Sequence, residues 1–189
     1  PATSGNTHGR IELRKEPVEL AEILNGAIEA SRPLLEKWEH ELTVIVPERP
    51  VRLLADPIRL TQVFLNLLNN AAKYTSRGGR IELKAEQEGE DVVVSVRDNG
   101  IGIPPEMLPR IFDPFAQLNR TLERSDGGLG IGLTLVKRLL DLHGASVEAR
   151  SEGAGKGSQF LVRLPLAARE LKQTDTQSGQ PAESLPPSP

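Results

Sequence analysis

Apolar residues recur at helical spacing in three stretches of the chain, which are 18–38, 57–75 and 131–143. Pro33 lies inside the first stretch and is expected to kink or divide that helix. Asp56 and Pro57 open the second, because Asp is a good N-cap and Pro is favoured at the first helical position. Gly144 ends the third stretch. The pattern therefore predicts three main helices and a shorter one over 104–111.

Runs of β-branched and aliphatic residues between these helices predict strands at 10–14, 41–46, 51–55, 80–88, 91–97, 145–150 and 158–164. Glu16 and Pro17 are expected to end the first strand, and 88–90 is typical of a hairpin turn. The run 92–96 alternates only weakly, which predicts a strand buried on both faces. Together the elements predict an α+β fold: a two-layer α/β sandwich whose helices cover one face of a mixed, mostly antiparallel sheet.

The composition sets limits on domain number and partners. With 189 residues, of which 38% are hydrophobic, the chain has room for one ordinary domain and some spare length. We assign the domain to 10–167, a loose start to 1–9 and a disordered tail rich in Gln, Thr, Ser and Pro to 168–189. A net charge of -3 without a basic block argues against nucleic acid as a partner. The chain has no cysteine, which fits a reducing compartment.

A band of polar residues lies beside the apolar arc of the second helix and consists of Gln62, Asn66, Asn69, Asn70 and Lys73. Asn costs about 0.5 kcal/mol relative to Ala in a helix, so an ordinary solvated face would be filled by other residues. The band is either an unusual surface or a stripe aimed at a ligand. In the second case Asn66 and Asn70 offer carbonyl oxygens to a hard cation such as Mg²⁺. Lys73 then meets a phosphate, and Tyr74 offers its ring to a base.

The motif DNGIGI at 98–103 follows directly on the strand at 91–97. On its own, Asp-Asn-Gly is typical of a tight turn. The second glycine, Gly102, allows the backbone to approach a ligand closely. Asp98 can accept a hydrogen bond from an exocyclic amine, and N6 of adenine is such a donor. A plain turn and the wall of a nucleotide site are therefore both open interpretations.

A second glycine cluster, GGLGIGL at 127–133, leads straight into the third helix. Free backbone N–H groups and the positive end of the helix dipole suit such a turn to phosphates. The spacing of Gly128, Gly130 and Gly132 is not that of the dinucleotide fingerprint, and the P-loop and eukaryotic-type kinase motifs are missing. A nucleotide site in this chain must therefore use another scaffold.

Taken together, these motifs resemble the boxes of sensor histidine kinases, and they occur in that family's order. The segments that carry the resemblance are the N box at 66–75, the first glycine box at 98–103, the F box at 111–115, the second glycine box at 128–133 and the closing G-x-G-T-x-F segment at 155–160. The resemblance covers about 10–165. It implies the ATP-binding fold shared with type II topoisomerases, a chaperone and mismatch-repair ATPases.

The resemblance also implies a role for each matching residue. Asn70 would be the principal Mg²⁺ ligand, with Asn66 near the metal and the phosphates. Asp98 would bind the adenine amine, and Ser158 stands where the family more often has Thr. Phe112 and Phe115 would either anchor a lid over the site or pack in the core. The implied ATP-binding residues are Asn66, Asn70, Lys73, Tyr74, Asp98, Gly100, Gly102, Ile103, Phe115, Gly128, Leu129, Gly130, Ile131, Gly132, Leu133 and Ser158.

The residue at position 66 bears on the kind of reaction. Hydrolytic relatives place a general-base Glu there, whereas Asn66 cannot accept a proton at neutral pH. The resemblance therefore implies a cytoplasmic catalytic domain that uses ATP and Mg²⁺ to phosphorylate a His on a dimerisation domain absent from this chain, with a response regulator as downstream partner. The parent, a homodimer, could be membrane-anchored, and this fragment is expected to be a monomer. The alternative is an ATP-gated interaction module of the same superfamily that transfers no phosphoryl group.

Overall fold

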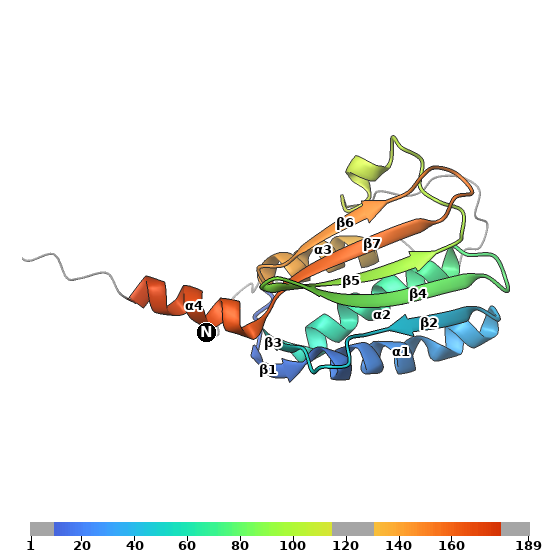
Figure 1. Ribbon diagram of the computed structural model, residues 1–189. Helices are drawn as coiled ribbons and strands as arrows, with labels where there is room; N and C mark the ends of the chain where they lie inside the picture. Colours follow the sequence, from blue (N-terminus) through green and yellow to red (C-terminus); the bar gives the residue numbers. More distant parts are fainter. Residues whose placement is uncertain (1–9, 115–130, 179–189) are drawn as a thin grey trace, which may run out of the picture.

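The computed structural model describes residues 10–114 and 131–178, and it has a layer of helices packed on one face of a sheet (Figure 1). The strand order in the five-stranded sheet is β2 (Glu41–Ile45), β4 (Arg80–Glu88), β5 (Asp91–Asp98), β7 (Ser158–Pro165) and β6 (Ser146–Arg150). β2 runs parallel to β4 and the other neighbours are antiparallel. The helices of the layer are α1 (Leu20–Lys37), α2 (Pro57–Lys73) and α3 (Ile131–Leu142). The predicted fold class is confirmed.

A separate two-stranded sheet joins β1 (Glu16–Glu19) to β3 (Arg52–Ala55) at one end of the molecule. The prediction of a strand at 10–14 that ends at Pro17 is therefore wrong, because Pro17 lies inside β1, opposite Leu54. Pro lacks a backbone N–H, and each strand of a two-stranded sheet has an edge where that loss is tolerated. The predicted pair 41–46 and 51–55 also divides between the two sheets.

The central helix α2 forms as its sequence predicts. Asp56 is the N-cap, and its carboxylate accepts a hydrogen bond from the Arg59 backbone N–H at 3.2 Å. The apolar arc is buried between α1, α3 and the sheet, and its members are Leu60, Val63, Phe64, Leu67, Leu68, Ala71 and Ala72. Helix α1 is not divided at Pro33, which lies on its exposed side. A short 3-10 helix at Leu108–Arg110 replaces the longer helix predicted over 104–111.

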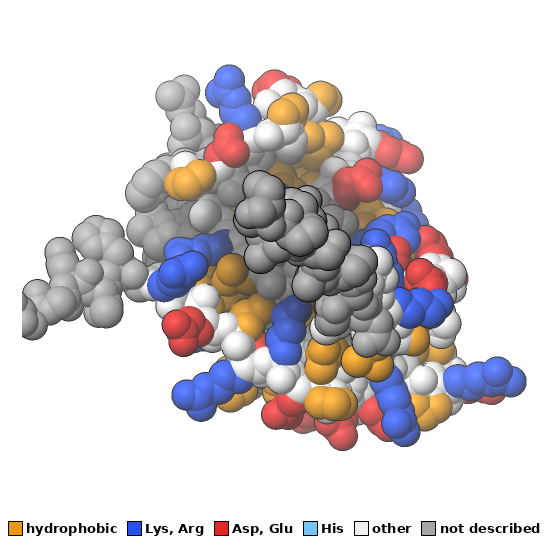
Figure 2. All heavy atoms as spheres, turned by 90° about the vertical axis from the view of Figure 1, so that its left-hand side faces the viewer, with side chains coloured by type: hydrophobic (Ala, Val, Ile, Leu, Met, Phe, Trp, Pro, Cys, Tyr) orange, Lys and Arg blue, Asp and Glu red, His pale blue; other side chains and the backbone are white. Residues whose placement is uncertain are grey.

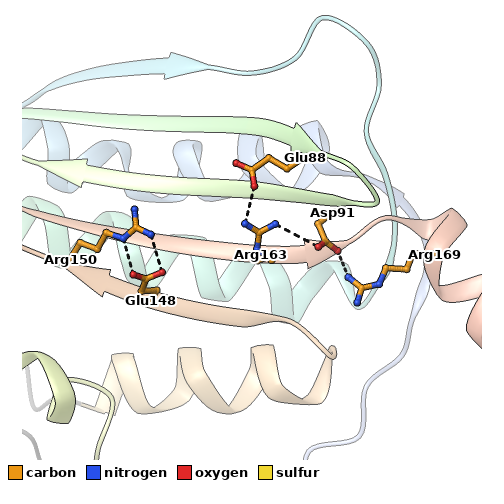
Figure 3. A network of polar contacts seen from close by, with 6 residues as sticks. All are labelled: Glu88, Asp91, Glu148, Arg150, Arg163 and Arg169. Carbon is orange, nitrogen blue, oxygen red and sulfur yellow. Dashed lines mark hydrogen bonds and ion pairs between the residues drawn. The ribbon is translucent and has the colours of Figure 1, made fainter.

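Strand β5 is buried along the face that meets the helices and in part on the other face, so the prediction of burial on both faces holds only in part. Val92, Val94 and Val96 are buried on the first face, whereas on the other face Ser95 is buried, Val93 is half-buried and Arg97 is exposed. The outer face of the sheet carries ion pairs instead of a second layer (Figure 3). The Arg163 guanidinium lies 2.8 Å from the Glu88 carboxylate, and Arg150 pairs with Glu148 at 2.7 Å.

The expected disorder from 168 onward is also wrong for part of that segment, because Ala167–Ser178 forms helix α4. Arg169 pairs with Asp91 (Figure 3), and Lys172 pairs with Glu90 at 2.7 Å. These two ion pairs attach α4 to the β4–β5 hairpin. α4 leaves the body at the end where charged side chains of both signs intermingle on the surface (Figures 1 and 2). No helix among the described residues is both long and apolar enough to span a membrane.

Candidate nucleotide site

The Asp-Asn-Gly turn packs directly against the C-terminal end of α2. The Ile101 backbone N–H donates a hydrogen bond to the Tyr74 carbonyl at 3.0 Å. A Cβ on Gly100 would lie 2.2 Å from that same carbonyl oxygen, so only glycine fits there. The first glycine motif and the Asn-bearing helix, which are separate in sequence, therefore meet at one place.

Asp98 is the last residue of strand β5 and is a buried hydrogen-bond acceptor beside this turn, with 6% of its surface exposed. One carboxylate oxygen accepts a hydrogen bond from the Gly100 N–H at 2.9 Å. The other accepts one from the Ser158 hydroxyl at 2.7 Å, because Ser158 lies opposite Asp98 in the β5–β7 ladder. Burial raises the pKa of Asp98, and the hydrogen bonds from Ser158 and Gly100 only partly oppose that rise. The carboxylate keeps acceptor capacity that these two donors do not use.

The loop at 151–157 closes over the same turn. Gly102, at a φ of +71°, would place a Cβ 2.0 Å from the Gly153 carbonyl oxygen. The Ser151 hydroxyl accepts a hydrogen bond from the Ile103 N–H at 3.0 Å and donates one to the Gly157 carbonyl at 2.7 Å. Sequence reasoning identified the glycines of the closing segment but missed Ser151, for which no motif gives a signal.

The polar stripe of α2 meets the start of α3. The Asn66 side-chain amide donates a hydrogen bond to the Gly132 carbonyl at 3.4 Å. Gly132, the last glycine of the second motif, is thereby placed against the stripe. Asn66 and Asn70 are half-buried, whereas Lys73 is exposed.

Some of the remaining sequence-predicted residues lie within the described ranges and others lie outside them. Tyr74 is half-buried, whereas Ile103 and Leu133 are buried. Phe112 packs edge-on against Phe160 with ring centroids 6.1 Å apart, which is core packing. Ile131 begins α3. The predicted residues that lie outside the described ranges are Phe115, Gly128, Leu129 and Gly130.

The donor set near the stripe suits a magnesium ion that is bound mainly through phosphates. Among the described residues, no group of three or more His, Cys, Asp or Glu side chains could hold a metal ion. Mg²⁺ usually takes one or two protein oxygens and completes its shell with waters and substrate phosphates. The amide oxygen of Asn70 can supply such a single protein ligand.

His40 lies against the C-terminal end of α2. Its side chain is half-buried, and its Nε2 lies 2.8 Å from the Ala72 carbonyl oxygen in the last turn of α2. A carbonyl at a helix C-terminus lacks an intrahelical donor, so the imidazole N–H satisfies it. His40 therefore supports the helix end that carries the predicted site residues.

Comparison with known proteins identifies the family. Residues 55–168 match the family described as histidine kinase-, DNA gyrase B-, and HSP90-like ATPase. The sensor histidine kinase RcsC of Escherichia coli K12 is 37% identical over 165 residues, which are 86% of this chain and 17% of RcsC. The chain thus spans about a sixth of that relative's length.

Two solved structures share the fold. Full-length ShkA in complex with AMPPNP matches 83% of this chain and 32% of its own, with a TM-score of 0.71 and 34% identity. The histidine kinase ThkA in complex with the response regulator protein TrrA matches 84% of this chain and 43% of its own, with a TM-score of 0.69 and 25% identity. RcsC and ThkA are histidine kinases by name, and the chain belongs to the family of histidine kinase-, DNA gyrase B- and HSP90-like ATPases.

Proposed function

We propose that this chain is the ATP-binding catalytic domain of a sensor histidine kinase, which binds Mg-ATP and passes the γ-phosphoryl group to a histidine on its parent's dimerisation domain. The observation that carries the proposal is the convergence of Asp98, the end of α2 and the start of α3. Asp98 is held by Gly100 and Ser158, and Asn66 contacts Gly132. Asp98, the acceptor for a base, and the start of α3, which suits phosphates, thus lie on either side of the polar stripe of α2.

Each part of Mg-ATP has a partner in this arrangement. The buried carboxylate of Asp98 accepts a hydrogen bond from the adenine amine, and Tyr74 packs on the ring. The glycines before α3 and the helix dipole hold phosphate oxygens. Asn70 ligates Mg²⁺, which when bound neutralises phosphate charge, and Lys73 pairs with a phosphate. In the solved structures, full-length ShkA was crystallised with AMPPNP, which supports an adenine nucleotide as ligand.

Phosphoryl transfer is favoured over hydrolysis by the residue at the α2–α3 contact. Asn66 donates its amide N–H to Gly132 and has no group that could deprotonate water. In phosphoryl transfer the enzyme mainly positions the groups and neutralises charge, so the nucleophile can come from another domain. An imidazole nitrogen of the acceptor histidine attacks the γ-phosphorus, and ADP leaves. A response regulator receives the phosphoryl group next, as the complex of ThkA with TrrA suggests by analogy.

The metal role is tested with Asn70→Asp and the control Gln62→Glu, which adds the same charge elsewhere on the stripe. Calorimetry with AMPPNP is run with and without Mg²⁺. We expect Asn70→Asp to abolish the Mg²⁺-dependent gain in affinity, because the new charge repels the phosphates, and Gln62→Glu to keep that gain. Equal AMPPNP affinity for Asn70→Asp and the wild type would refute the role.

Transfer is tested by mixing the chain with the dimerisation domain of its parent and γ-labelled ATP. The expected result is acid-labile label on the added domain and none on the histidines of this chain. Label on His8, His40 or His143 would contradict the assignment. Nucleotide binding without any transfer would instead identify an ATP-gated interaction module.

A further inference from the structure

We infer that the hydroxyl of Thr75 is a second base-recognition group, which donates a hydrogen bond to ring nitrogen N1 of adenine through one ordered water. The inference rests on the proposed function, since it assumes that Asp98 binds the adenine amine. Thr75 follows the end of α2 and has 2% of its surface exposed. Its Oγ1 is buried and has no hydrogen-bond partner among the described residues.

The unpartnered hydroxyl faces the same turn as the Asp98 carboxylate. A Cβ built on Gly100 would lie 2.8 Å from Thr75 Oγ1 and 2.9 Å from Asp98 Oδ1. The two oxygens therefore approach one point from different elements, α2 and β5. The carbonyl of Tyr74 lies 2.2 Å from that point and already accepts the Ile101 N–H. The Thr75 hydroxyl is thus the group beside Asp98 whose hydrogen-bonding capacity is unused.

Packing does not require this hydroxyl. The Thr75 methyl carbon Cγ2 fits against Gly79, where a Cβ would lie 2.0 Å from it. Valine would keep that contact and lose only the oxygen. A buried hydroxyl without a partner is unfavourable, and such groups in native proteins call for an explanation, commonly an ordered water. A water shared with a ligand gives the hydroxyl a partner.

The two side chains together suit the polar edge of adenine. That edge presents a donor at N6 and an acceptor at N1, which match the acceptor Asp98 and the donor Thr75. Guanine and hypoxanthine present an acceptor at O6 and a donor at N1, so the acceptor Asp98 opposes them, whereas the Thr75 hydroxyl and its water can either donate or accept. Thr75 therefore contributes to affinity, and Asp98 to selectivity for adenine.

The test compares Thr75→Val with the wild type by calorimetry, using ADP and 1-deaza-ADP, which lacks the N1 acceptor. We expect Thr75→Val to bind ADP about 5- to 10-fold more weakly, the scale of one neutral hydrogen bond. The two proteins should bind 1-deaza-ADP equally. The melting temperature of nucleotide-free Thr75→Val should equal or exceed that of the wild type, since a purely structural hydroxyl would lower it on removal.

Equal ADP affinity for Thr75→Val and the wild type would overturn the inference. So would an equal loss for ADP and 1-deaza-ADP. If Thr75→Val does not fold, Thr75→Ser and Thr75→Ala supply the same comparison, because both lack the methyl and only Ser has the hydroxyl. Wild-type protein that binds no ADP at all would contradict the proposed function instead, so the two failures are distinguishable.

Discussion

Two aspartates with the same exposure lie at opposite ends of α2 and differ in the direction of their pKa. Asp56 caps the N-terminus of the helix, Asp98 lies beside its C-terminal end, and each has 6% of its surface exposed. The pKa of Asp56 is lowered, whereas that of Asp98 is raised. Burial alone therefore does not decide the charge state of a carboxylate in this protein.

The difference comes from the balance between desolvation and hydrogen bonding, since each carboxylate has three hydrogen-bond donors but desolvation outweighs them only at Asp98. Burial on its own raises the pKa of Asp56, but the backbone N–H groups of Arg14, Arg59 and Ile58 outweigh it. Arg14 and Arg59 donate to its two oxygens at 3.0 and 3.2 Å. For Asp98 the desolvation exceeds its hydrogen bonds. A carboxylate whose hydrogen bonds outweigh its desolvation serves the fold, and one whose desolvation is not offset is a candidate for ligand binding.

Among the variants that test the contrast between Asp56 and Asp98, Asp98→Asn should have the largest effect. The amide cannot accept the adenine amine at the position of the oxygen that it replaces, so we expect AMPPNP affinity to fall about 100-fold, the scale of a lost buried hydrogen bond to a charged acceptor. The raised pKa gives Asp98 a stabilising effect that is present at low pH and lost as pH rises through its folded value. That contribution is smaller at pH 7.5 than at low pH, so the melting temperature of Asp98→Asn at pH 7.5 should fall less than that of Asp56→Ala.

Calorimetry and thermal melts on the same preparations measure both quantities for Asp98→Asn. A variant that melts much lower than the wild type would place Asp98 with Asp56 as a structural carboxylate. Unchanged AMPPNP affinity would remove its role in base recognition.

Asp56→Ala should show the opposite pattern. It removes the N-cap of α2 and the acceptor of the Arg14 N–H, so we expect a loss of about 2 kcal/mol in the free energy of unfolding. AMPPNP affinity of the folded protein should change little, because the site lies at the other end of the helix. Urea unfolding measures the loss. The control Asp56→Asn keeps a good N-cap and should lose less, and equal losses for Ala and Asn would contradict the capping role.

The parts of the fold that the sequence predicts well depend on local signals. α2 has a cap, a proline and an unbroken apolar arc within one segment, and the β4–β5 hairpin has its own turn at Gly89. The structure places both as predicted. The order of the motifs then identified the family. The spacing of the motifs in the sequence does not by itself show that they meet in space, because that meeting depends on the fold.

What the sequence did not reveal depends on distant partners. β1 forms only because Pro17 and its neighbours pair with β3, and α4 is mostly polar yet is attached through Arg169 and Lys172 to the β4–β5 hairpin. Ser151 lies in no motif and Thr75 is only the last residue of one, so their roles follow from the residues that they face. Local pattern cannot give such contacts, because each joins segments far apart in the chain.

The smallest expected effect on the contrast between Asp56 and Asp98 concerns His143, which lies beside Asp56 at the N-terminal end of α2. It is 2% exposed, and its Nε2 accepts a hydrogen bond from the Asp56 N–H at 3.1 Å. Its Nδ1 lies 2.8 Å from the Leu139 carbonyl and donates to it, so the ring is neutral with its proton on Nδ1. Burial lowers the pKa of His143; the charge of Lys15 adds to that effect, and those of Asp56 and Glu170 oppose it.

The sign of the pH dependence follows from this neutral ring. Below a pH of about 6.5 the unfolded chain binds a proton at His143 that the folded protein does not, so stability is complete above that value and is lost as pH falls towards the lowered folded pKa. The slope from one such group cannot exceed about 1.4 kcal/mol per pH unit. His143→Gln keeps an acceptor for the Asp56 N–H and does not titrate. Urea unfolding at pH 7.5 and 5.5 should therefore show a larger loss for the wild type than for His143→Gln. Equal losses would mean that His143 binds its proton as readily in the folded protein as in the unfolded chain. Burial beside Asp56 would then not disfavour the charged form of His143.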